Sequence, residues 1–99
     1  MVACITVTVL TPANITATSI TGTPSDPCIF GSCAVNVNVR WTNNGQATGA
    51  IVPNITIDGN PVTPAPYPSV DMVGGAILDR TFTVTGLTAG PHDICPSPA

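Results

Sequence analysis

The stretch Val35-Asn36-Val37-Asn38-Val39-Arg40-Trp41 alternates apolar and polar side chains without a break. Because successive side chains of an extended chain point to opposite faces, the valines and Trp41 share one face and the three polar residues share the other. A strand with one apolar face buries that face against a second layer of structure. The stretch therefore predicts a β-strand of a layered, all-β protein.

Similar segments lie on both sides of this strand, separated by turn residues. Asn43-Asn44-Gly45 supplies residues that tolerate a left-handed turn, and Asp58-Gly59 predicts a tight hairpin into Pro61-Val62. We expect loops at residues 22–32 and 64–68 and a corner at 86–90. Further strands are expected at residues 4–10, 15–20, 51–57, 69–73, 78–84 and 91–95. About seven strands predict a single domain, residues 1–99, with an immunoglobulin-like antiparallel β-sandwich fold; a small barrel is the alternative.

Composition narrows the class of protein. The 99 residues include 11 prolines and 9 glycines, which would interrupt helices, while 43% hydrophobic residues is too many for a disordered chain. Only 7% of residues are charged and the net charge is −3, so partners such as nucleic acid or an anionic bilayer are disfavoured. No apolar run is long enough to predict membrane insertion, and Met1 to Cys4 lacks the features of a signal peptide.

Four cysteines in a small domain of low charge are typical of an exported, oxidised protein. Three pairings are open. Cys28 and Cys33 flank a short segment containing a glycine and are candidates for a local disulfide, which leaves Cys4 and Cys95 to join the two ends of the chain. The second bridge would restrict the unfolded chain most, by roughly 4 to 5 kcal/mol. The spacing does not match zinc ribbons or fingers, so we expect no metal site.

Three segments in order resemble the CARDB family, the cell-adhesion-related domains of bacteria and archaea. They are Val37 to Gly45 with Trp41-Thr42-Asn43-Asn44-Gly45 at its end, Ile55-Thr56-Ile57-Asp58-Gly59, and Phe82 to His92 with the corner Gly86-Leu87-Thr88-Ala89-Gly90-Pro91-His92. The resemblance covers roughly residues 35 to 95. It implies an immunoglobulin-like or fibronectin-like fold, exposure at the cell surface, and a spacer or adhesive role without catalytic residues. The four cysteines and the proline-rich loop depart from the family pattern.

Residues with catalytic potential are sparse. His92 is the single histidine, and the resemblance places a structural histidine there. No serine lies in a Gly-x-Ser-x-Gly motif, so a hydrolase is disfavoured and we expect neither enzyme activity nor a cofactor. The carboxylates are scattered along the chain without the spacing of a glycosidase or calcium site; they are Asp26, Asp58, Asp71, Asp79 and Asp93.

Two features of the sequence relate to sugars. Asn14-Ile15-Thr16 and Asn54-Ile55-Thr56 are N-glycosylation sequons, so Asn14 and Asn54 are candidate modification sites. Trp41 is a candidate for stacking on a sugar, although its place on the apolar face favours the core. Loops around Tyr67 or Trp41 would support a carbohydrate-binding module as the weakest of three functional hypotheses.

The two stronger hypotheses are both non-catalytic and extracellular. The first is a structural or adhesive module of a cell-surface protein, with neighbouring domains as partners. The second is a subunit that polymerises with identical subunits into a pilus-like filament by β-strand addition. Its candidate assembly strand is the alternating N-terminal segment, with Val2, Ile5, Val7 and Val9 as the apolar residues.

Overall fold

The fold is all-β. The computed structural model describes residues 3–29 and 32–99, with the backbone alone described for residues 25–29 and 32. Eight strands are present in the described part, which confirms the predicted class with one strand more than expected. They are β1 (Ile15–Ile29), β2 (Ser32–Asn43), β3 (Gly49–Ile51), β4 (Asn54–Ile57), β5 (Asn60–Pro61), β6 (Val70–Met72), β7 (Ile77–Leu87) and β8 (Ile94–Ser97).

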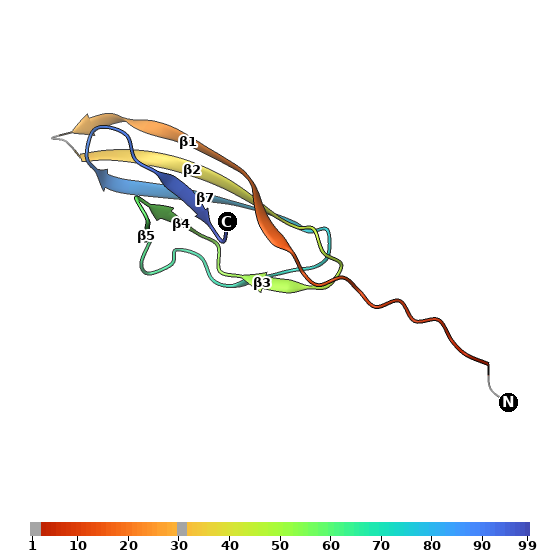
Figure 1. The fold of residues 1–99 in the computed structure, drawn as a ribbon. Helices are drawn as coiled ribbons and strands as arrows, with labels where there is room; N and C mark the ends of the chain where they lie inside the picture. Colours follow the sequence, from red (N-terminus) through yellow and green to blue (C-terminus); the bar gives the residue numbers. More distant parts are fainter. Residues whose placement is uncertain (1–2, 30–31) are drawn as a thin grey trace.

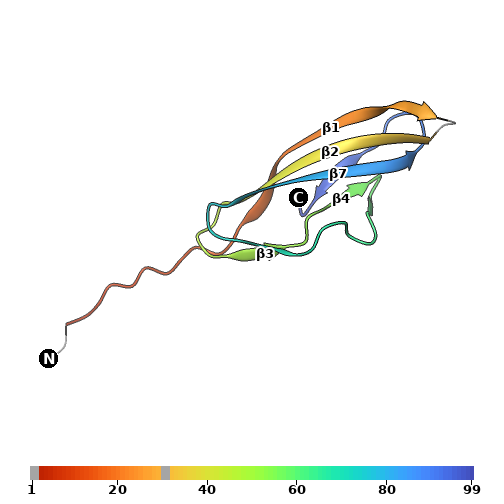
Figure 2. The ribbon, with the colours of Figure 1, turned by 180° about the vertical axis from the view of Figure 1, so that it is seen from behind.

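The strands form three antiparallel sheets. The largest has the order β1-β2-β7, and it faces a smaller sheet of order β5-β4-β8 (Figures 1 and 2). A short pair, β3-β6, continues the smaller layer near the N-terminal side of the body. In this arrangement β1, β7, β5 and β8 are edge strands, each with one side that no described strand pairs.

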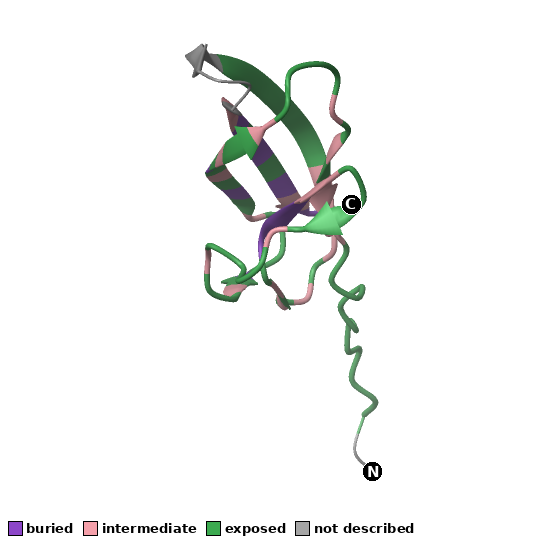
Figure 3. Cartoon of the chain, turned by 90° about the vertical axis from the view of Figure 1, so that its left-hand side faces the viewer, coloured by how far each residue is buried: buried purple, intermediate pink, exposed green. Residues whose placement is uncertain are grey.

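The core lies between the two layers, where Figure 3 shows the buried bands of the large sheet. Val37, Val39 and Trp41 are buried, as their alternation predicts, and Ile55 and Phe82 pack against them from β4 and β7. The Phe82 ring makes T-shaped contacts with both Trp41 and the half-buried Tyr67, with centroids 6.3 and 5.2 Å apart. The predicted apolar face of residues 35–41 is therefore confirmed as the centre of the fold.

The opposite face of the large sheet is polar. Thr81 and Thr83 of β7 donate hydrogen bonds to Asn38 and Asn36 of β2, at 2.7 and 3.0 Å. Arg40 and Asp79 form a bidentate ion pair nearby, with nitrogen to oxygen distances of 2.8 and 3.1 Å. The pair raises the pKa of Arg40 and lowers that of Asp79, mainly through the shared hydrogen bond, but water screens such an exposed pair.

Several predicted strand boundaries were wrong. Residues 4–10 form no strand, because no part of the described chain lies beside them. The expected loop at 22–32 is largely strand, since Thr21 to Ser25 pair with Ala34 to Asn38. The expected strand 51–57 is two strands: the chain leaves the pairing with β6 at Ile51 and joins β8 at Asn54, with Pro53 between them. The last strand begins at Ile94, after Pro91.

The Asp58-Gly59 hairpin is confirmed. Both residues have positive φ, of 50° and 86°, and they join β4 to β5 with two residues between the paired ends, as in a type I′ turn. Asn43-Asn44-Gly45 differs from expectation, because none of these residues has positive φ. Their contribution to the turn is hydrogen bonding instead.

The side chain of Asn43 is completely buried and makes four hydrogen bonds. Its Oδ1 accepts from the backbone N–H groups of Asn14 and Gly45, at 3.1 and 3.0 Å. Its Nδ2 donates to the carbonyls of Ala47 and Met72, both at 2.9 Å. One amide therefore ties together the start of β1, the turn after β2 and the end of β6.

We expect Asn43→Ala to lower the free energy of unfolding by about 3 kcal/mol, because it removes four hydrogen bonds and leaves backbone groups unpaired. Asn44→Ala is the control; its exposed side chain makes one hydrogen bond, to Thr16, and its loss is expected to cost less than about 1 kcal/mol. Urea unfolding followed by Trp41 fluorescence measures both. Equal destabilisation by the two substitutions would contradict the role of Asn43.

Candidate functional site

The N-terminal segment, residues 3–10, stands away from the folded body (Figures 1 and 2). Ile5, Val7 and Val9 are 83%, 70% and 84% exposed, and Leu10 is 57% exposed. The molecule measures 81 Å along its longest axis but 22 and 17 Å across, and its radius of gyration of 18.7 Å exceeds the roughly 13 Å of a compact domain of this length. We call residues 3–10 the tail; it carries strand-forming residues that no other described part of the chain buries.

The base of the tail is held firmly. The Thr11 N–H donates to Oε1 of Gln46 at 2.9 Å, and the Thr11 carbonyl accepts from the N–H of Ala47 at 3.0 Å. Pro12 passes so close to Gly45 that a Cβ on Gly45 would lie 1.9 Å from the Pro12 carbonyl oxygen. The absence of a side chain at Gly45 therefore allows this crossing, and the direction in which the tail leaves the body is fixed.

The inner face of β1 is only partly covered. Ile20 and Gly22 pair with Val39 and Val37 of β2, so they point to the same side of the sheet as those core residues. Nevertheless Ile20 is 37% exposed, and Gly22 and Pro24 are exposed as well. We call this uncovered part of the inner face of β1, together with the unpaired edge of β8, the β1/β8 slot.

An apolar hollow of about 270 Å³ lies beside Pro24, at the hairpin end of the uncovered part of β1. It occurs where the hairpin of β1 and β2 meets the corner that follows β7. Most of its wall is apolar, with few polar atoms. The residues around it include Pro24, Cys33, Ala34, Val35, Leu87 and Ala89.

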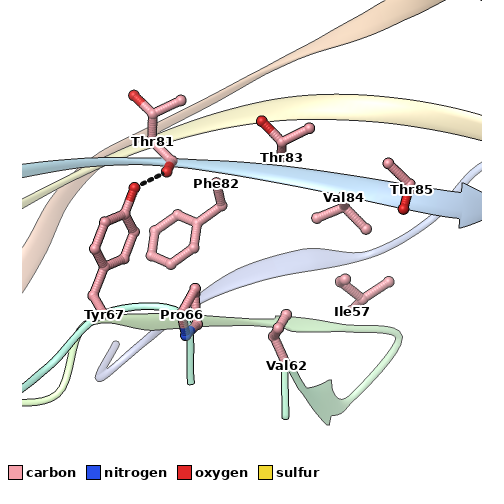
Figure 4. A pocket seen from close by; sticks show the side chains of 9 residues that line it. All are labelled: Ile57, Val62, Pro66, Tyr67, Thr81, Phe82, Thr83, Val84 and Thr85. Carbon is pink, nitrogen blue, oxygen red and sulfur yellow. Dashed lines mark hydrogen bonds between the residues drawn. The ribbon is translucent and has the colours of Figure 1, made fainter. Parts of the chain in front are cut away.

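A larger groove of about 510 Å³ lies beside the unpaired edge of β7 (Figure 4). Phe82 and Val84 of β7 point into it from one side, and Ile57 and Val62 line the other. The Tyr67 hydroxyl donates a hydrogen bond to the Thr81 carbonyl across its end. The proline-rich segment 64–68, correctly predicted as a loop, therefore covers part of this edge.

The cysteine pairing in the structure differs from the predicted one. Cys4 and Cys95 are free and exposed, so the predicted bridge between them is absent: Cys4 lies in the tail, which the fixed base directs away from the body. Cys33 is disulfide-bonded. The side chain of Cys28 and the whole of Val2 lie outside the described residues, so the Cys28–Cys33 pairing and the place of Val2 in an assembly strand stay predictions.

His92 joins the β4–β5 hairpin to the segment before β8. Its Nδ1 lies 2.7 Å from Oδ2 of Asp58, and its Nε2 lies 2.7 Å from the Thr88 carbonyl oxygen. Oδ1 of Asp58 accepts from the N–H of Asp93 at 2.9 Å. The hydrogen bond with Asp58, followed by that with Thr88, raises the pKa of His92; the hydrogen bond with His92, followed by that with Asp93, lowers the pKa of Asp58.

Both ring nitrogens of His92 thus face acceptor oxygens, a position that suits the doubly protonated ring. Sequence patterns did not indicate this interaction, although the Asp-Gly turn and the histidine after Gly90-Pro91 are both visible there. The contacts are structural, because they fasten two segments together. His92 lines the smaller hollow, but Asp58 does not. Among the described residues, no three His, Cys, Asp or Glu side chains are placed to hold a metal ion together.

The structure gives different outcomes for the three candidate sugar sites. Asn14 is exposed, and its modification stays a prediction. Asn54 is 8% exposed and its Nδ2 donates to the Val62 carbonyl, so the folded protein does not present this nitrogen for glycosylation. Trp41 is completely buried, with its Nε1 donating to the Pro98 carbonyl, which confirms the core and contradicts stacking on a sugar. Within the described part, no helix is suited to crossing a membrane.

The contacts of His92 predict a pH dependence of stability. Because the pKa of His92 is raised in the folded protein, its stabilisation is complete below the pKa of the unfolded histidine and is lost as the pH rises through the folded pKa. The stabilisation by Asp58 has the opposite sign and is lost as the pH falls through its lowered pKa. We expect Tm to fall between about pH 5 and about pH 8, and His92→Ala to flatten this fall. Asp71→Asn, a change of an exposed carboxylate elsewhere, should leave it intact. An unchanged slope in His92→Ala would refute the assignment.

Comparison with protein-family models, with curated proteins and with solved structures found no match to this chain. The resemblance to the CARDB family stays a prediction. We base the function proposed below on the tail and on the exposed parts of the sandwich.

Proposed function

We propose that the protein is a non-catalytic, extracellular structural subunit that assembles with identical copies by β-strand addition through its N-terminal tail. The observation that carries the proposal is the tail itself. Its sequence alternates Ile5, Val7 and Val9 with threonines, in strand order, yet all three are more than two thirds exposed. A folded protein seldom leaves such a segment uncovered unless another molecule covers it.

The free energy of burying the apolar tail is comparable with the cost of bringing two subunits together. Full burial of Ile5, Val7 and Val9 would contribute roughly 5 to 9 kcal/mol. Bringing two molecules together costs about 4 to 15 kcal/mol, and the tail must also be ordered. Apolar contact by the tail is therefore comparable with the cost, and hydrogen bonds to an unpaired strand edge, together with burial of the acceptor's own apolar surface, supply the remainder.

The placement of the tail supports an open chain of subunits instead of a closed dimer. The tail leaves one end of an elongated body, and its base is fixed by Thr11 and by the crossing of Pro12 over Gly45. A contact between the tail of one copy and the body of the next joins two different surfaces. Repetition of such a heterologous contact generates a filament unless the rotation between copies closes a ring.

The extracellular assignment rests on composition and cysteine use. Low charge suits close contact between many copies, and the cysteine count is typical of exported domains. The CARDB resemblance is consistent with a structural role at a cell surface. A monomeric spacer or adhesive module, the first hypothesis from the sequence, shares this setting but leaves the exposed apolar tail without a role.

The test is assembly of the full chain and of Val7→Asp, measured with a reductant present so that only non-covalent association is scored. We expect light scattering and electron microscopy to show filaments for the wild type and a loss of at least tenfold in assembled mass for Val7→Asp, because a buried carboxylate opposes strand addition. Val7 lies in the tail, away from the body, so the variant should keep the wild-type Tm.

Val73→Asp is the matched control. Val73 is 62% exposed, similar to Val7, but lies on the body after β6. It should assemble like the wild type. A wild-type chain that stays monomeric at every concentration, or a Val7→Asp chain that assembles as well as Val73→Asp, would overturn the proposal and favour the spacer module.

A further inference from the structure

We propose that the tail of one copy fills the β1/β8 slot of the next, and that Cys4 of the tail forms a disulfide with Cys95 of that next copy. The inference rests on the proposed function and adds to it the acceptor site and a covalent link. Three independent features support it: the uncovered inner face of β1, the free edge of β8, and the positions of the two free cysteines.

The alternation of side chains puts the two thiols on the same side. With Ile5, Val7 and Val9 turned into the sandwich, Cys4, Thr6 and Thr8 face outward. In β8, Ile94 and Pro96 are partly buried whereas Cys95 is exposed on the outer face. Neighbouring strands of a sheet keep outward side chains together, so a tail strand beside β8 presents Cys4 on the face that carries Cys95.

The spacing along the strands also agrees. The hydrogen bond from Trp41 Nε1 to the Pro98 carbonyl places the residue after β8 beside Trp41, and β8 runs in the same direction as β2 (Figure 1). We therefore infer that Cys95, three residues before Pro98, lies near the level of Asn38. The apolar hollow is lined by Val35 and Cys33, three and five residues further towards the hairpin. In an extended tail, Val7 and Val9 are three and five residues from Cys4. With Cys4 beside Cys95, both valines reach the level of the hollow.

The same register covers the exposed part of β1. Gly22 and Pro24 pair with Val37 and Val35, the levels that Ile5 and Val7 would occupy, and Ile20 pairs with Val39, one inward position beyond Ile5. Ile20 would gain apolar neighbours, and the absence of a side chain at Gly22 leaves room for a branched side chain of the tail. A strand at this place closes the sandwich between β1 and β8, where the described part of the chain supplies none.

The backbone of β8 explains why a covalent link is useful here. The Asp93 carbonyl accepts a hydrogen bond from the Asp58 N–H on the β4 side of β8. Because the hydrogen-bonding direction of the backbone alternates along a strand, the backbone groups of Ile94 and Pro96 point to the free edge. Pro96 has no N–H to donate, which limits the hydrogen bonds that an added strand can form. A disulfide fixes the register that few backbone hydrogen bonds hold.

The groove beside β7 is the rival acceptor. Its edge is already engaged at Thr81 by the Tyr67 hydroxyl, and Pro66 and Tyr67 stand across it. No described cysteine lies there to meet Cys4. We therefore assign the tail to the β1/β8 slot and use the β7 edge as the alternative that the experiment must exclude.

The link forms by oxidation of two thiols. The thiolate of one cysteine attacks a small disulfide such as oxidised glutathione, and the second thiolate then displaces the attached half from the mixed disulfide. Per bond formed, two protons and two electrons leave the protein, and the oxidant departs as two molecules of thiol. Cys4 and Cys95 are exposed, so the oxidant has access to both before assembly.

The experiment mixes full-length chains labelled with 14N and 15N, allows them to assemble in a buffer of reduced and oxidised glutathione, blocks free thiols and separates the products without reductant. We expect a ladder of covalent oligomers, with mixed-isotope peptides that join Cys4 to Cys95. Cys95→Ser should lose the ladder while still assembling without a disulfide. The double variant Cys95→Ser/Thr85→Cys, which moves the thiol to β7, should not restore it.

The outcomes separate the two proposals. Filaments without Cys4–Cys95 peptides, or a ladder restored by Thr85→Cys, would overturn the β1/β8 assignment while leaving strand addition in place. Mixed-isotope Cys4–Cys95 peptides from filaments that Val7→Asp abolishes would support both. A chain that neither assembles nor forms covalent oligomers would overturn both together.

Discussion

The four hydrogen bonds of the Asn43 side chain hold together parts of the structure that would otherwise be independent. Asn43 is the last residue of β2, the strand whose apolar face makes the core, so the amide lies at the buried end of that face. It fixes Asn14, where the chain enters β1, and Met72, at the end of β6. Together with the hydrogen bonds of Thr11 and the crossing of Pro12 over Gly45, this anchor sets the direction of the tail on which the proposed assembly rests.

The two layers were predictable because their signal is local. The alternation in residues 35–41 specified a buried face, and the Asp-Gly dipeptide specified a tight turn; both are confirmed by burial and by positive φ. The division of residues 49–57 into β3 and β4 was not predictable, since the apolar pattern is continuous and the change of partner depends on where β6 and β8 lie. The extension of β1 beyond Gly22 likewise depends on pairing with β2, which overrides the proline and glycine content.

The candidate site shows the same limit in another form. The sequence specified a strand at residues 4–10, and the alternation that predicts it is real, but a strand needs a neighbour and a pattern does not say whether the neighbour belongs to the same chain. Ile20 carries the complementary information: its alternation assigns it inward, yet the described chain leaves it 37% exposed. The pairing of Asp58 with His92 was missed because it joins residues 34 positions apart through a turn and a corner.

The crossing of Pro12 over Gly45 has a mechanical consequence. Tension applied to the tail passes through Thr11 into Gln46 and Ala47, and through Asn14 into Asn43, before it reaches the long pairing of β1 with β2. That pairing lies roughly along the pulling direction, so its hydrogen bonds share the load in shear and do not open one after another. A chain of such subunits would resist stretching through the backbone ladder of each body.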